Sequence, residues 1–307
     1  MVRTLFFELK LKKIMKKQIT YLFIYLIFLT TLQGQIVQDR LPGAEEISNR
    51  RTSFNLDEIK VRWKKAALEN CTGVPCVVAP SFTCGTSTVS DIDGNAYNTV
   101  LIGTQCWTTS NLKVTKYNDG TAILLDASGG SDGVTGGENW STQLQGAYTV
   151  YGNTPTNATN YGYLYNWYAV SDLRKLCPTG WHVPTSGEWN ALASQLGGLT
   201  AAGGKLKSMG TTFWNSPNTG ADNSSGFSGL GGGLRLGDHT TPSFSTSYLG
   251  PPGTFVYVKD RGYFWSATSS STLGRAYARI LNASNLSLNE DSFSRLAEGQ
   301  SVRCLKD

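Results

Sequence analysis

The chain has 307 residues, including 34 glycines, 8 tryptophans and 14 tyrosines, and 16% of its residues are charged. This composition is typical of a loop-rich domain with short strands and an aromatic core, and it argues against a helical bundle. The net charge of +5 arises within the first 18 residues, which hold six basic residues and one acidic residue, so the remainder is neutral. A nucleic-acid-binding protein would carry a basic patch outside its leader. No nucleic-acid partner is therefore expected.

Residues 1–34 have the layout of a secretory signal peptide. Lys16 and Lys17 precede an apolar run from Ile19 to Leu32, and Gly34 supplies a small residue at the expected cleavage point. The run is shorter than the roughly 20 residues that span a bilayer comfortably. We expect a secreted or cell-surface protein that contacts the membrane only through this segment. An uncleaved signal anchor is the alternative, and Met15 is an alternative start.

Residues 35–83 are predicted to form a separate N-terminal helix and linker. Leu56, Ile59 and Trp63 place apolar side chains on one face of a helix that ends near Asn70. A helix of this length is not stable alone. It either docks on the following domain or belongs to a processed N-terminal region.

The main domain is predicted to span residues 84–307 and to open with a β-hairpin. Asp93-Gly94 is a strong two-residue turn signal, and alternating residues follow it. Its sequence, Asp91-x-Asp93-Gly94-Asn95, is also similar to a calcium loop. An EF-hand, however, requires glycine and glutamate at the sixth and twelfth positions, where this chain has Ala96 and Ile102. The turn is preferred, and no metal or other cofactor is expected.

Two polar segments, residues 126–160 and 215–253, are predicted to be long surface loops. Loops of this length are commonly functional. Aromatic side chains in and near them are weak candidates for ligand contacts, although burial in the core is the favoured alternative for each. These candidates are Trp140, Tyr151, Trp214, Tyr248 and Tyr257.

The stretch from Tyr161 to Gly197 contains the best-marked helix. Thr185 and Glu188 have capping-box spacing, and Pro184 and Trp189 are placed for a hydrophobic staple. We expect the helix to pack on the core through Trp189. The residues expected to form the structural framework around it are Trp181, His182, Pro184, Thr185, Glu188, Trp189 and Trp265.

These motifs resemble a known family. DIDGNAYNTVLIGTQCWTTSNL, YGYLYNWYAV, CPTGWHVPTSGEWNAL, GFSGL, YFWSAT and SVRCLKD look like the Fibrobacter succinogenes major paralogous domain, in family order. The resemblance implies an exported bacterial protein with an α+β, C-type-lectin-like fold of short helices, twisted antiparallel strands and long loops. The family has no established biochemical role. VPTSGEW and SVRC are also similar, more distantly, to formylglycine-generating-enzyme-like domains.

The cysteines fit this picture, because disulfides persist outside the cytoplasm. We predict the pairs Cys71–Cys76, Cys84–Cys106 and Cys177–Cys304. The second flanks the predicted hairpin. The third joins the central helix entry to the last strand, as in proteins of similar fold.

The function expected is a non-catalytic binding or adhesion module for an extracellular glycan or a surface protein. Calcium-dependent C-type lectins use Glu-Pro-Asn or Gln-Pro-Asp followed by Trp-Asn-Asp, and these motifs are missing here, since Trp214-Asn215 precedes Ser216. No reactive cysteine pair like that of formylglycine-generating enzymes is recognisable, so no catalytic residue is assigned. A secreted enzyme of that type and a purely structural surface protein are the alternatives.

Overall fold

The structure is a computed structural model, and it describes residues 81–127, 140, 143–237 and 253–307. All of these lie in the second of the two compact units into which the chain divides, Pro80–Asp307. The predicted signal peptide, the predicted helix over 55–70, the pair Cys71–Cys76 and Tyr248 fall outside the described residues. No helix among the described residues is long and apolar enough to cross a membrane.

The first sheet brings the two ends of the domain together. Its strand order is β1, β2, β3, β13 and β7. The bounds are β1 (Thr88–Ser90), β2 (Ala96–Ile102), β3 (Gln105–Thr108), β7 (Trp181–His182) and β13 (Leu305–Lys306). Leu305 of β13 pairs with Trp107 of β3 on one side and with His182 of β7 on the other. The last strand therefore joins the opening hairpin to the entry of the central helix.

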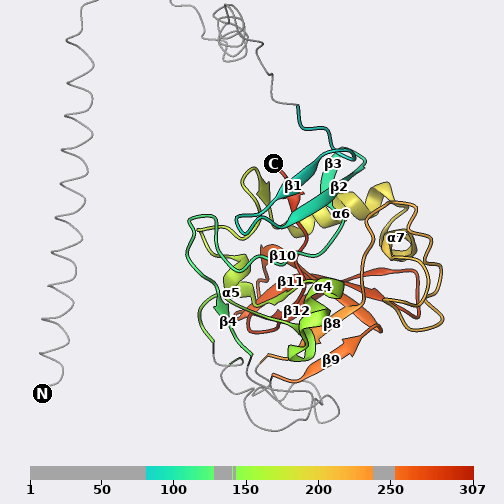
Figure 1. The fold of residues 1–307 in the computed structure, drawn as a ribbon. Helices are drawn as coiled ribbons and strands as arrows, with labels where there is room; N and C mark the ends of the chain where they lie inside the picture. The colour runs from blue at the N-terminus through green and yellow to red at the C-terminus, as the bar shows by residue number, and fades with distance from the viewer. Residues whose placement is uncertain (1–80, 128–139, 141–142, 238–252) are drawn as a thin grey trace, which may run out of the picture. The chain divides into compact units, whose positions relative to one another are not determined.

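The second sheet lies beneath the first in Figure 1, with its edge strand β9 at the far end of the described part. Its strand order is β12, β11, β10, β8 and β9. The bounds are β8 (Gly232–Arg235), β9 (Phe255–Val258), β10 (Arg261–Ser269), β11 (Arg275–Asn282) and β12 (Leu288–Arg295). All its pairs are antiparallel except β10 with β8. A third, small sheet joins β4 (Leu124–Leu125), β5 (Ala147–Thr149) and β6 (Leu164–Tyr165).

The helices are short. They are α4 (Pro155–Tyr161), α5 (Trp167–Val170), α6 (Ser186–Gln195) and α7 (Leu199–Leu206), with a 3₁₀ turn η2 (Tyr151–Asn153). The predicted capping box is confirmed, because the Thr185 hydroxyl accepts from the Glu188 amide and the Glu188 carboxylate accepts from the Thr185 amide. The predicted loop over 126–160 is wrong for its second half, which forms β5, η2 and α4. Pro155, at the first turn of α4, is a helix-start signal that polar composition concealed.

Tryptophans are the largest side chains buried in the core. Trp181, Trp189 and Trp265 are buried as predicted, at 4%, 0% and 0% exposure. The Trp189 ring lies 4.8 Å from that of Trp107. The Trp265 indole donates to the Tyr165 carbonyl at 2.7 Å, which satisfies its polar atom inside the core. The domain is thus α+β and mostly strand, with few short helices.

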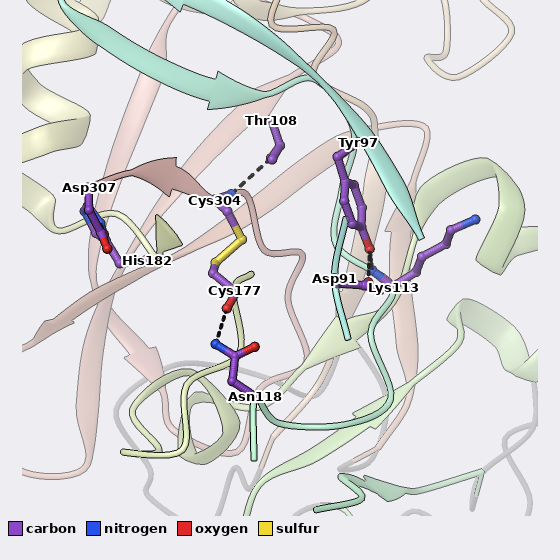
Figure 2. Close-up of a disulfide and its surroundings, with 9 residues drawn as sticks. All are labelled: Asp91, Tyr97, Thr108, Lys113, Asn118, Cys177, His182, Cys304 and Asp307. Carbon is purple, nitrogen blue, oxygen red and sulfur yellow. Dashed lines mark hydrogen bonds and ion pairs between the residues drawn. A yellow bond between two sulfur atoms is a disulfide. The ribbon is translucent and has the colours of Figure 1, made fainter. Parts of the chain in front are cut away.

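Two disulfides are present among the described residues, and both were predicted. Cys84 is joined to Cys106 and Cys177 to Cys304. Figure 2 shows the second bridge with the Cys304 amide donating to Thr108 and the Cys177 carbonyl accepting from Asn118. The bridge therefore fixes the last strand to the helix entry from both sides.

Two buried cations hold loops together without any carboxylate partner among the described residues. The Lys207 ammonium donates to three backbone carbonyls, those of Thr219, Asn282 and Asn285. The Arg303 guanidinium donates to the carbonyls of Thr108, Phe227 and Ser228 and to the Asn111 side chain. Burial lowers the pKa of Lys207 to about 8 and that of Arg303 to about 9. Full hydrogen bonding compensates much of the cost of burying each charge.

Candidate functional site

Two of the predicted ligand residues, Trp140 and Trp214, are fully buried. The Arg235 guanidinium lies 4.4 Å from the centre of the Trp140 ring. The Trp214 indole donates to the Gly229 carbonyl, and the Lys207 ammonium lies 5.7 Å from its ring. Neither ring presents a surface to a ligand, so both follow the favoured alternative, burial in the core. Arg235, far along the chain from Trp140, and Lys207, close in sequence to Trp214, each place a cation near the buried ring.

Tyr151 is half-buried and lies against the edge of the second sheet. Its ring centre is 5.2 Å from that of Phe255, and a Cβ atom on Gly233 would meet its ring at 2.5 Å. Glycine at 233 therefore makes room for this ring. No ring contact joins Tyr151 to Tyr257 among the described residues, so these two candidates do not form one platform.

Tyr257 is half-buried, and it breaks the alternation of strand β9. In an antiparallel pair, opposite residues share a face, and Leu234 lies opposite Val256. Regular alternation would place Tyr257 on the other face from Val256. Tyr257 instead packs in one cluster with Leu234, Val256 and Tyr263. Its φ of 67°, a conformation rare for an aromatic residue, accompanies this departure.

Arg261, on the neighbouring strand β10, completes this surface. Its guanidinium carbon lies 4.2 Å from the centre of the Tyr257 ring, and Nη1 donates to the Tyr263 hydroxyl at 3.2 Å. The rings of Tyr257 and Tyr263 are 6.3 Å apart. Burial raises the pKa of Tyr263 to about 12, so it stays a neutral phenol. We use the name tyrosine face for the half-buried side chains around the buried Tyr263, which are those of Val256, Tyr257, Arg261 and Ile280, together with Tyr263 itself.

The turn that carries the tyrosine face is held by backbone hydrogen bonds to three other segments. The Lys259 amide donates to the Gly231 carbonyl at 2.7 Å, and the Lys259 carbonyl accepts from the Asn215 amide at 2.8 Å. The Asp260 carbonyl accepts from the Ala283 amide at 2.9 Å. Such anchoring holds the side chains in place before any ligand arrives, which lowers the entropy lost on binding.

Glu298 is a carboxyl group that acts electrostatically on this face, where its charge adds to burial in raising the pKa of Tyr263. It is half-buried, and its Oε2 accepts from the side-chain amide of Gln300 at 3.0 Å. Burial, followed by the negative charge of Asp291, raises the pKa of Glu298 to about 7. The charge of this side chain therefore changes near neutral pH.

His182 is held by two carboxylates. Its Nδ1 lies 2.6 Å from Asp307 Oδ1 and its Nε2 lies 2.9 Å from Glu188 Oε1; Figure 2 shows His182 and Asp307 side by side. Burial lowers the pKa of His182, but the two carboxylates outweigh burial and leave that pKa above its ordinary value. Both nitrogens are engaged, so neither is free to accept a proton from a nucleophile. The imidazole ties the capping box of α6 to the last strand.

The aspartates of the opening hairpin are also engaged within the protein. Asp91 accepts from the amides of Asp93 and Asn95 and from the Tyr97 hydroxyl, an arrangement visible in part in Figure 2. Asp93 pairs with Lys116 at 3.0 Å. The described residues contain no group of three histidine, cysteine, aspartate or glutamate side chains placed to hold a metal ion.

The sequence interpretation named Tyr257 but missed Arg261 and Tyr263. The segment from Lys259 to Gly262, a charged turn between two aromatic strands, is a hairpin signal that could have brought them together. The orientation of Tyr257 could not have been found this way. No glycine or asparagine marks position 257 as left-handed.

The fold and this surface define a disulfide-linked, mostly β domain with an anchored aromatic face beside a guanidinium. Residues 100–306 match the family described as the Fibrobacter succinogenes major domain, and the chain belongs to that family. No curated protein and no solved structure matches the chain.

Proposed function

We propose that the protein is an exported, non-catalytic binding module that holds an extracellular glycan on the tyrosine face. The observation that carries the proposal is Tyr257, whose ring lies beside Tyr263 despite the alternation of its strand. A bulky residue at positive φ costs about 1–3 kcal/mol, and such strain gathers at functional sites. Aromatic rings with a few convergent polar groups suit the apolar faces and hydroxyls of sugars.

Export and a C-type-lectin-like fold belong to the same proposal. The two disulfides suit an oxidising compartment outside the cytoplasm. The leader layout at Lys16, Lys17 and the following apolar run supports export. The calcium-dependent sugar motifs are missing from this sequence, so the proposed binding is independent of calcium.

A glycan and extracellular-protein array with the full chain tests the proposal, using Tyr257→Ala as the variant. The matched control is Tyr168→Ala, since Tyr168 is also half-buried but lies just after β6 in α5, away from the tyrosine face. We expect glycan binding in the presence of a chelator, its loss in Tyr257→Ala and its retention in Tyr168→Ala. Binding to proteins alone, or glycan binding that Tyr257→Ala leaves intact, would contradict the proposal.

A further inference from the structure

We propose that the tyrosine face selects glycans that carry a carboxylate, as uronic acid units do, and that Arg261 is the residue that binds this carboxylate. The inference rests on the proposed function and names its ligand class. It follows from the position of one guanidinium, which is oriented by two tyrosines and has no carboxylate partner among the described residues.

Arg174 provides the internal comparison. Its guanidinium carbon lies 4.1 Å from the centre of the Tyr117 ring, nearly the geometry of Arg261 over Tyr257 at 4.2 Å. Arg174 also forms a two-pronged pair with Asp172, with Nε at 2.8 Å and Nη2 at 2.7 Å from the carboxylate oxygens. The chain thus contains two arginine–tyrosine stacks of similar geometry. In the Arg174 stack, a carboxylate also occupies the fork of the guanidinium. Arg261 has the stack and no such partner in the described part of the chain.

The fully buried arginines show how this chain treats guanidinium groups elsewhere. Arg235 contacts Asp126, and Arg279 pairs with Glu290 through Nη2, although Arg279 Nη1 has no hydrogen-bond partner among the described residues. Arg303 has four hydrogen bonds to the protein. By contrast, Arg261 forms one hydrogen bond to the described residues, from Nη1 to the Tyr263 hydroxyl. A guanidinium carries five N–H donors. No other hydrogen bond joins Arg261, which is half-buried, to a residue in the described part of the chain.

A planar carboxylate fits the fork of the guanidinium, as it does at Arg174 and Asp172. Guanidinium and carboxylate are both planar and form two parallel hydrogen bonds, which adds specificity to charge attraction. A uronic acid also carries a sugar ring that can lie against the tyrosine face beside the guanidinium while its carboxylate meets Arg261. Neutral hexoses would use the ring contact alone.

The acidic groups near Arg261 leave it free for a ligand. Asp260 is exposed, and its Oδ1 accepts from the Asn215 side-chain amide at 2.7 Å; its charge acts on Arg261, but no ion pair joins the two side chains. Glu298 accepts from Gln300. Lys259 and Arg261 together outnumber the single carboxylate of Asp260, so the net charge of the turn is positive.

The test is calorimetric titration of the full chain with polygalacturonate and with the same polymer fully methyl-esterified, which masks the carboxylates and keeps the sugars. We expect the free acid to bind about tenfold more tightly or better, the size typical of a charge-assisted pair. Arg261→Gln should abolish this preference. Arg261→Lys should keep part of it, since lysine retains the charge but loses the fork.

Arg174→Gln is the matched control, because it also removes a guanidinium from a tyrosine ring. This variant should still prefer the free acid to the methyl-esterified polymer. Thermal melting of each variant shows whether it folds, and Arg261→Lys keeps the test informative if Arg261→Gln does not. Equal binding of both polymers would overturn the inference and leave glycan binding standing. Preferential binding of dextran sulfate over polygalacturonate would overturn the carboxylate assignment, and binding to no glycan would overturn the proposed function itself.

Discussion

Arg303 and Arg261 show how differently two regions of the domain treat the same side chain. In the interior, Arg303 is fully buried and each guanidinium nitrogen donates to a protein oxygen. On the tyrosine face, Arg261 is half-buried, stacked on Tyr257, and bonded to a single phenol. The guanidinium of Arg303 is thus fully hydrogen-bonded, whereas the described residues leave donors of Arg261 without a partner. Stability is expected to depend on the first region and ligand binding on the second.

The largest effect should come from the disulfide that closes the interior. Replacing Cys177 and Cys304 by serine removes a bridge across 127 residues, worth about 5 kcal/mol on the loop-entropy model. The same change at Cys84 and Cys106, 22 residues apart, should cost about 3 kcal/mol. Urea denaturation of the two double variants measures the difference. A greater loss at Cys84 and Cys106 would mean that the first hairpin, not the last strand, is the main constraint.

Arg303→Met and Arg261→Met compare the two regions directly. The first leaves buried carbonyls without a donor and should lower the free energy of unfolding by about 3–5 kcal/mol. The second removes a partly exposed stack and should cost less than about 1 kcal/mol. Chemical denaturation at one pH measures both. Similar losses would show that Arg261 stabilises the packed framework as Arg303 does, which would contradict its assignment to ligand binding.

Glu298 should lower the stability of the folded protein at high pH. Its pKa rises from 4.5 to about 7 on folding, so the folded state holds an extra proton between these values. The free energy of unfolding therefore falls as pH rises through this window. Glu298→Gln should be more stable than the unaltered protein at pH 8, by about 1–2 kcal/mol after allowance for partial exposure, and equally stable at pH 4. A variant that is less stable at pH 8 would contradict the raised pKa.

His182 should produce the smallest effect, and its substitution should destabilise the protein, whereas Glu298→Gln stabilises it. Its pKa is raised in the folded state, so its contribution is complete below about 6.5 and is lost as pH rises through the folded value. The pKa of Glu188 is lowered, and its contribution to the free energy of unfolding is lost as pH falls below about 4.5. His182→Gln should therefore cost about 0.5–1 kcal/mol at pH 5.5 and less at pH 9. An equal cost at both values would show that charge plays no part.

The sequence was most informative where local signals agreed with one another. Thr185 and Glu188 predicted the start of α6, and the cysteine positions with the family resemblance predicted both described disulfides. These features depend on short-range chemistry or on ordered motifs.

It was least informative where distant residues decide the outcome. Trp140 was placed on a loop, yet Arg235, far along the chain, lies over its ring, and the indole of Trp214 donates to the carbonyl of Gly229 in the interior. The sequence identified only part of the candidate site. Tyr257 could be named from its position, but its left-handed backbone and its contact with Arg261 depend on the anchored turn between β9 and β10. Tertiary contacts of this kind override local propensity.

Hydroxyl-radical footprinting of the full chain, with and without oligogalacturonate, tests the central claim most directly. Protection of Tyr257, with Tyr168 and the buried Trp214 unchanged, is the result expected if the tyrosine face holds the glycan. Unchanged reactivity of Tyr257 at saturating ligand, or protection confined to another surface, would contradict it.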